Sequence, residues 1–424
     1  MNGIEKDRAL LRAMFDAAVA AAAPSKLIGA HLPAPPKGRL IVIGAGKAAA
    51  AMAAAFEAAW GDRAPRPEGL VVTRYGHSAP TRLIEVVEAA HPEPDEAGRT
   101  AARRILDLAS GAGPDDLVVA LISGGGSALL TMPAEGISFA EKQELTRALL
   151  ASGAPIGEMN TVRKHVSAIK GGRLALAAHP APVLTLAISD VPGDDASVIG
   201  SGPTVADESS FAQAREILAR RGVSPAASIR AHLEAAAEET PEPGDPRLAR
   251  AEFRLIGAPM LSLEAAAALA EAAGVKALIL GDALEGEARE LGAEMAARAL
   301  REHGPVALIS GGETTVTLSA GQRPGGRGGR NVEFLLGLAE ALNGAAGISA
   351  IAGDTDGVDG MEEVAGAIVD PETPHRAAAA GRSVRDALRD HDGHGFFAAT
   401  GDQVVTGPTL TNVNDFRAVL VRRA

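Results

Sequence analysis

Short apolar segments that run into glycine alternate with helical segments along most of this chain. In the first half the apolar runs are RLIVI at 39–43, GLVVT at 69–73, LVVALI at 117–122 and PVLTLAIS at 182–189. Strands of this kind, separated by helices, are typical of a parallel, doubly wound α/β sheet. Because open sheets bind ligands beyond the carboxyl ends of their strands, the residues that follow each run are the candidate site residues.

The chain is long enough for two domains. A single hydrophobic core rarely grows beyond about 250–300 residues, and this chain has 424. The segment PEPGDP at 241–246 interrupts the pattern, and apolar runs resume at 253–257, 276–280, 306–310 and 348–352. We therefore predict an N-terminal domain over 1–245 and a smaller α/β domain over 246–424, with an amphipathic helix over 4–23 at the start.

Composition excludes several classes of function. The chain has no cysteine, which rules out disulfides, zinc–thiolate sites, iron–sulfur clusters and thiol nucleophiles. Its net charge of −12 argues against sequence-independent nucleic-acid binding. No secretory signal and no run of about 18 apolar residues is visible, so we expect a soluble, cytoplasmic protein without a membrane span. The oligomeric state is open between a monomer and a homodimer.

Two glycine-rich loops follow strands of the predicted N-terminal domain. The first, Gly44-Ala45-Gly46-Lys47, matches a dinucleotide-binding fingerprint loosely and a Walker loop not at all. Lys47 lies in the first turn of a helix, where a bound anion would offset its unfavourable position; the alternative is a solvated lysine. The second loop, Ser123-Gly124-Gly125-Gly126-Ser127, offers backbone N–H groups and hydroxyls to a phosphate or carboxylate, or is simply a flexible turn.

The remaining candidates are charged residues near predicted strand ends or helix starts. GGRGGRN at 325–331 places Arg327, Arg330 and Asn331 at a helix start, which suits phosphoryl oxygens, the alternative being a mobile basic loop. GDTDGVDG at 353–360 places Asp354 and Asp356 after a strand; it fails the EF-hand pattern but suits Mg²⁺ shared with phosphates, or is an Asp-rich turn. Asp190, at the end of the 182–189 run, is a candidate general base or metal ligand.

Seven motifs occur in one order along nearly the whole chain, from about residue 5 to 422. They are GAGKAAAAM, HPEPDEAG, LISGGGSALL, SDVPGDDASVIGSGPT, GGRGGRN, AGDTDGVDG and TGPTLTNVNDF. The series resembles the glycerate 2-kinases that carry a C-terminal MOFRL domain. The resemblance implies a Rossmann-like N-terminal domain, a smaller α/β domain and an active site in the cleft between them. Val332 departs from the family, in which we expect a glutamine at this position.

The implied reaction is phosphorylation of D-glycerate by ATP to 2-phosphoglycerate, with Mg²⁺ as cofactor. Lys47 and Arg330 match the lysine and arginine proposed as active-site residues in that family, and phosphoryl transfer depends on such positioning and charge neutralisation. The alternative is an NADP-dependent hydroxypyruvate reductase. The loose dinucleotide fingerprint supports it, and Thr73-Arg74 after the next strand would favour NADP over NAD. A third class is a non-catalytic sensor of sugar acids.

Overall fold

The computed structural model describes residues 2–318 and 326–423, and it divides into two compact units. One unit spans Pro24–Ile256, and the other combines Met1–Ala23 with Gly257–Ala424. Gly325 of the arginine motif lies outside the described residues.

The 24–256 unit is built on a six-stranded sheet with the order β3-β2-β1-β4-β5-β6. Its pairs β1–β2, β2–β3, β1–β4 and β4–β5 are all parallel. Parallel strands buried on both faces read as continuous apolar runs, which is why LIVIGA and LVVALIS were visible in the sequence. The strands are β1 (Leu40–Ala45), β2 (Pro67–Arg74), β3 (Ile84–Ala89), β4 (Leu117–Ser123), β5 (Val183–Ile188) and β6 (Ala251–Gly257).

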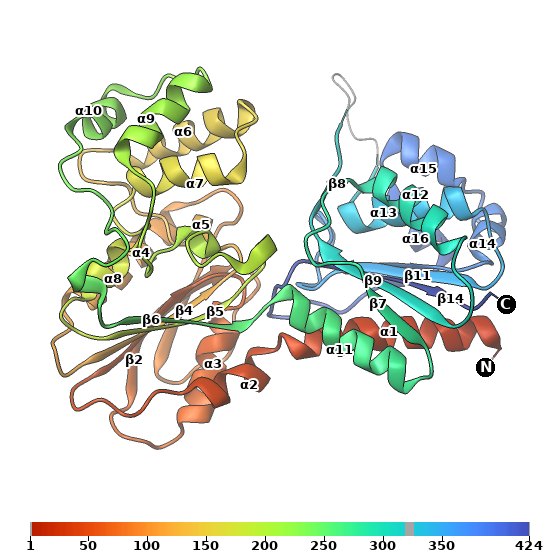
Figure 1. The fold of residues 1–424 in the computed structure, drawn as a ribbon, viewed down its shortest axis with the longest axis horizontal. Coiled ribbons are helices and arrows are strands. Elements are labelled where there is room, and N and C mark those ends of the chain that lie inside the picture. The colour runs from red at the N-terminus through yellow and green to blue at the C-terminus, as the bar shows by residue number, and fades with distance from the viewer. Residues whose placement is uncertain (1, 319–325, 424) are drawn as a thin grey trace. The chain divides into compact units, whose positions relative to one another are not determined.

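Helices cover both faces of this sheet, α3 (Ala49–Trp60) on one face and α4 (Glu96–Ser110) with α8 (Arg173–Ala178) on the other (Figure 1). The α4 side is closed by a core in which Ile105 and Leu174 meet Ile43 and Val118. A second core, around Leu149, Val162 and Phe211, joins four further helices. These are α6 (Phe139–Ala151), α7 (Ile156–His165), α9 (Phe211–Arg220) and α10 (Ala227–Ala235), with the short α2 (Pro24–Leu27) and α5 (Gly126–Leu129) elsewhere in the unit.

The other unit has a mixed six-stranded sheet with the order β13-β12-β11-β14-β9-β7. Only β7–β9 is a parallel pair; the pairs β9–β14, β14–β11, β11–β12 and β12–β13 are antiparallel. The strands are β7 (Lys276–Ile279), β9 (Val306–Gly312), β11 (Ile348–Asp354), β12 (Gly366–Val369), β13 (Gln403–Val404) and β14 (Asp415–Val421). A separate parallel pair joins β8 (Gly286–Glu287) to β10 (Thr314–Thr315).

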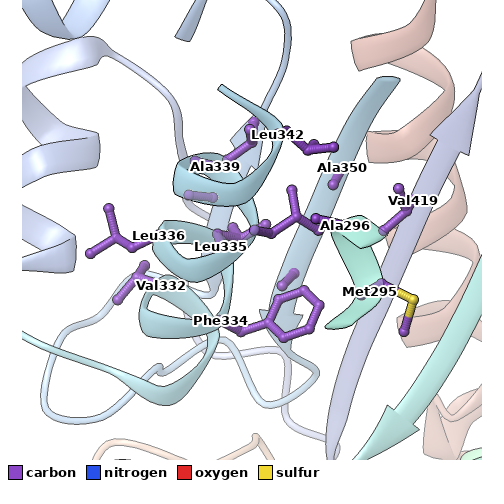
Figure 2. Close-up of a cluster of buried hydrophobic side chains, with 14 of the residues drawn as sticks. Met295, Ala296, Val332, Phe334, Leu335, Leu336, Ala339, Leu342, Ala350 and Val419 are labelled. Atoms are coloured by element: carbon purple, nitrogen blue, oxygen red, sulfur yellow. The ribbon is translucent and has the colours of Figure 1, made fainter. Parts of the chain in front are cut away.

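Apolar helix faces close both sides of the mixed sheet. Helices α1 (Gly3–Ala21) and α11 (Pro259–Ala272) share one core with its strands, through residues such as Phe15 and Leu263. Helices α12 (Ala288–Ala299) and α13 (Arg330–Leu342) contribute to the core on the other side, where Figure 2 shows Met295, Phe334 and Val419. The remaining helices are α14 (Thr373–Ala379), α15 (Val384–Asp390) and α16 (Gly393–Thr400).

The compact units differ from the predicted domains 1–245 and 246–424 at both ends. Leu11, Phe15 and Ala18 of α1 pack on the mixed sheet, so the first helix belongs with the C-terminal unit. Strand β6 lies beyond PEPGDP but completes the parallel sheet of the 24–256 unit. Local sequence pattern shows that an element has an apolar face and leaves open which sheet buries it. Among the described residues no helix is both long and apolar enough to cross a bilayer.

Candidate functional site

The two glycine-rich loops of the 24–256 unit lie side by side because β1 and β4 are paired strands. In the register Ala45 lies opposite Ile122, so both loops begin at the same sheet edge. The Lys47 amide donates to the Gly124 carbonyl at 2.8 Å, and the Ala48 amide donates to Ser123 Oγ at 3.0 Å. The structure thus brings Lys47 and the 123–127 loop together at the carboxyl ends of β1 and β4. Lys47 lies in the turn before α3 and not, as predicted, in the first turn of that helix, because α3 begins at Ala49.

Gly44 and Gly46 have a packing explanation that the sequence did not reveal. A Cβ on Gly44 would collide with the Leu121 carbonyl oxygen, and one on Gly46 would collide with Ser123 Oγ. Gly46 also has a φ of +138°, which side-chain-bearing residues rarely adopt. Its amide donates to the Val72 carbonyl at 3.1 Å. These contacts account for both glycines through the close approach of neighbouring backbone, and a role in nucleotide binding stays a prediction.

The side chain of Lys47 lies beside the middle of the second loop. A Cβ built on Gly125 would be 3.3 Å from Lys47 Cγ and 3.1 Å from His91 Nε2. Burial, followed by the charges of Lys47, Arg74 and His77, lowers the pKa of His91 to about 3. His91 is therefore neutral near pH 7, and the local positive charge comes from Lys47 and Arg74.

Asp190 follows the neighbouring strand β5 by two residues. In the β4–β5 register Ser123 lies opposite Ile188, so Asp190 lies at the same edge of the sheet as the glycine loops. The next turn is held locally, since the Val191 amide donates to Ser189 Oγ at 3.1 Å. The catalytic role predicted for Asp190 is consistent with this edge and remains a prediction.

In the other unit Arg330 is the first residue of α13 and is bound by three carboxylates. Its Nε donates to Asp415 Oδ1 and its Nη2 to Asp354 Oδ2, both at 2.8 Å, and its Nη1 donates to Glu313. Burial alone lowers the pKa of this guanidinium, but Asp415, Asp354 and Glu313 together raise it well above its ordinary value. Arg330 is thus permanently charged and oriented from three sides.

The three carboxylates come from adjacent strand ends. Asp354 ends β11, Asp415 begins the antiparallel β14, and the two are opposite each other in the register. Glu313 follows the end of β9, the other neighbour of β14. Asp415 also accepts from Asn331 Nδ2 at 2.8 Å and from the buried Arg417 at 2.6 Å. Sequence reasoning missed Glu313 and Asp415, although Asp415 lies within the quoted motif TGPTLTNVNDF.

Asp359 holds the start of α13 in place. Its two carboxylate oxygens accept from the amides of Asn331 at 3.1 Å and Val332 at 3.0 Å. A negative charge at a helix N-terminus is stabilising, but complete burial raises the pKa of Asp359 to about 7 against these hydrogen bonds. The Val332 side chain lies in the apolar core (Figure 2). The unexpected valine therefore serves packing.

Arg327 and Asn331 differ in what they can offer a ligand. Arg327 forms an exposed pair with Glu362, Nε to Oε1 at 2.8 Å. Asn331 is fully buried, and its Oδ1 has no hydrogen-bond partner among the described residues. Arg330 and Asn331 both donate to Asp415 Oδ1, whereas Arg327 forms an exposed ion pair, and their roles toward a ligand stay predictions.

The predicted metal ligands Asp354 and Asp356 fit Mg²⁺ unequally. Asp354 uses Oδ2 for its ion pair with Arg330 and Oδ1 for the Asp356 amide. The Asp356 carboxylate is buried and accepts from the Val358 amide through Oδ1 at 2.9 Å. Within the described part of the chain no group of three or more His, Asp or Glu side chains is arranged to hold a metal. A dedicated protein cage is thus not formed there, and Asp354 is the weaker candidate because a cation bound to it would lie beside the Arg330 guanidinium.

Known proteins match nearly the whole length of this chain. Residues 10–234 match the domain of unknown function DUF4147, and residues 306–415 match the MOFRL family. A putative hydroxypyruvate reductase of Agrobacterium vitis is 56% identical over 98% of this chain and 94% of its own length. The D-glycerate 2-kinase of Thermotoga maritima is 40% identical over 92% and 93%.

A solved structure agrees with these sequence matches. The crystal structure of a glycerate kinase from Thermotoga maritima has a TM-score of 0.87 and 37% identity, over 98% of this chain and 100% of that one. The resemblance inferred from the seven motifs is thereby confirmed. This chain, in which a DUF4147 region is followed by a C-terminal MOFRL region, belongs to the glycerate kinase family.

Proposed function

We propose that this chain transfers a phosphoryl group from ATP to the 2-hydroxyl of D-glycerate, giving ADP and 2-phosphoglycerate. The observation that carries the proposal is the arrangement around Arg330. Buried Asp354 and Asp415 fix Nη2 and Nε, while Glu313, at Nη1, is 55% exposed. An exposed ion pair is worth little, so a phosphoryl oxygen can replace Glu313 without disturbing the guanidinium. Stabilising charge on the transferred group is the main task of a phosphotransferase.

Lys47 is proposed to supply a second positive charge to the phosphates, and Asp190 to accept the proton of the attacking hydroxyl. Ser123, Gly124, Gly125, Gly126 and Ser127 would bind nucleotide or substrate oxygens. Helical N–H groups at the start of α5, such as those of Gly126 and Ser127, have no acceptor within their own helix, which supports this role. The strand order 3-2-1-4-5-6 supports a Rossmann-like description of the 24–256 unit.

A hydroxypyruvate reductase is the competing function, because Agrobacterium vitis relatives at 56% and 51% identity carry that name. The geometry of the first loop argues against it. A dinucleotide fold presents the amides after its first strand to the pyrophosphate. Here the amides of Gly46, Lys47, Ala48 and Ala49 donate to Val72, Gly124, Ser123 and Gly46. These internal bonds would have to break before a pyrophosphate could bind.

We expect ADP release with D-glycerate and ATP, and no oxidation of NADPH with hydroxypyruvate. Adding enolase alone should convert the product to phosphoenolpyruvate, because the phosphate lies on the 2-hydroxyl. A signal that requires phosphoglycerate mutase as well would assign the 3-hydroxyl instead. NADPH oxidation without ADP release would replace the kinase by the reductase.

Mg²⁺ is proposed to enter with ATP, where it would neutralise charge on the phosphates, and Asp356 is the residue proposed to contact it. We expect Asp356→Asn to raise the Mg²⁺ concentration that gives half-maximal rate by roughly 10-fold, with little change in the KM for glycerate. Asp354→Asn should lower kcat without this shift, because Asp354 orients Arg330. A magnesium titration of the initial rate at fixed ATP separates the two. Equal magnesium dependence in wild type and Asp356→Asn would remove Asp356 from the metal site.

A further inference from the structure

Three cationic side chains of the 24–256 unit influence one another electrostatically, and one of them contacts the second glycine loop. They are Lys142 on α6, Arg163 on α7 and Lys170 in the turn that follows, and we call them the basic cluster. Lys142 is 5% exposed and Lys170 is 1% exposed. Nothing in the sequence marked them, because they lie on helices and turns away from the strand ends.

Lys170 connects the cluster to the loop. Its Nζ donates to the Ser127 carbonyl oxygen at 2.7 Å and lies 3.3 Å from Ser127 Oγ. Ser127 Oγ is 2.7 Å from Ser201 Oγ, which in turn donates to Asn160 Oδ1 at 3.2 Å. Hydroxyl, amide and ammonium groups from four segments of the chain thus converge at one place.

The basic cluster lacks compensating negative charge. Lys142 donates to the Met132 carbonyl at 3.2 Å, and Lys170 has only the Ser127 oxygens. Across the described residues none of the three cations, Arg163 included, has a carboxylate within ion-pair distance. The neighbouring Lys164 shows the usual solution, a buried pair with Asp207 at 3.0 Å. Buried charges are normally paired, so the two buried lysines beside the partly exposed Arg163 need another explanation.

The electrostatic state of these groups supports their proximity. Burial and then Lys142 and Arg163 lower the pKa of Lys170 well below its ordinary value. Burial and then Arg163 lower the pKa of Lys142 to about 7, and burial lowers the pKa of Arg163. A bound anion would offset both the burial of these cations and the repulsion between them.

We propose that the basic cluster binds the carboxylate of the three-carbon acid, with Arg163 and Lys170 as its principal partners. The proposal rests on the proposed function and deepens it. A planar guanidinium fork matches a carboxylate, and the Ser127, Ser201 and Asn160 groups suit the adjacent oxygens of a hydroxy acid. A site with buried cations rejects a ligand that lacks the anion, because its charges are then left unpaired. The basic cluster would therefore exclude glycerol and other neutral polyols.

The test compares Arg163→Gln and Lys170→Met with Arg147→Gln, a matched change at an exposed arginine on α6. Titration calorimetry with D-glycerate, and separately with glycerol, measures binding in each protein. Arg163→Gln and Lys170→Met should weaken D-glycerate binding by roughly 10- to 100-fold, the usual loss for one charged hydrogen bond. The KM for ATP should be unchanged, and Arg147→Gln should match wild type.

Folding is checked by thermal melting. Lys170→Met removes a buried unpaired charge and keeps the length of the side chain, so its melting temperature should equal or exceed that of wild type. D-glycerate should raise the melting temperature of wild type but not that of Lys170→Met. This readout separates ligand binding from support of the loop.

Three outcomes would overturn the proposal. The first is unchanged D-glycerate binding in both variants. The second is a raised KM for ATP with an unchanged KM for glycerate, because the basic cluster would then bind a phosphate of the nucleotide. The third is a lower kcat with unchanged D-glycerate binding, which would mean that the basic cluster only positions the Ser127 loop. The proposed kinase function is judged separately, by ADP release from wild type, and survives any of these results.

Discussion

Replacing Arg330 by alanine should lower kcat by roughly 10²–10³-fold, the scale for losing one group that stabilises transition-state charge. The variant should also unfold more readily. Removing one partner of a buried ion pair costs about 3–5 kcal/mol, and Arg330 is the partner of buried Asp354 and Asp415. Arg330→Lys keeps the positive charge but loses the planar guanidinium that donates in several directions. Compared with Arg330→Ala, it should therefore recover more of the stability than of the activity.

The control for this prediction is Arg385→Ala, because Arg385 is 87% exposed in its pair with Glu340. Steady-state kinetics and thermal melting of the same samples separate the two effects. Glu313→Gln offers a further check, since it removes the contact that a phosphoryl oxygen is proposed to replace; its kcat should be retained and its KM for ATP should not rise. A normal kcat in folded Arg330→Ala protein would leave Arg330 with a structural role only.

Replacing Lys47 by methionine should also lower kcat by roughly 10²–10³-fold. The backbone of Lys47 is fixed by its bond to Gly124 and does not depend on the side chain. Methionine keeps the aliphatic length beside Gly125 and His91 and removes the ammonium group. The loss should therefore appear in the chemical step, which a single-turnover experiment with bound ATP measures.

Lys26→Met is the matched control, because Lys26 is exposed on the short helix α2 of the same unit. Lys47→Arg should retain part of the activity, since it keeps a positive charge at this position. If Lys47→Met turned over at the wild-type rate, the lysine would be no more than a solvated residue in the turn before α3. The glycine loop would then owe its composition to backbone packing alone.

The sequence was sufficient for features that depend on nearest neighbours in the chain. Apolar runs at 39–43, 117–122 and 182–189 correspond to β1, β4 and β5, because a strand buried on both faces has to be apolar throughout. The runs at 306–310 and 348–352 correspond to β9 and β11 for the same reason. Glycine loops after strands were equally visible, since their composition is local.

Strands β12 and β14 were not predicted, and with them the four antiparallel pairs of the mixed sheet were missed. Their order beside β11 depends on pairings between distant segments, which no local periodicity reports. Because local periodicity does not report such pairings, the predicted domain boundaries also differ from those of the compact units. The amphipathic face of α1 was visible, but only the tertiary structure shows that it is buried by α11 and the mixed sheet.

The sequence by itself determined which residue types stand at the strand ends, and therefore the family and the class of chemistry. Only the tertiary structure decided their partners. Arg330 and Asp415 are 85 residues apart and meet because β14 pairs with β11 and β9. The basic cluster likewise depends on the turn after α7, which brings Lys170 to the Ser127 loop. Ion pairs and unpaired buried charges depend on distances across the fold, and sequence spacing does not contain those distances.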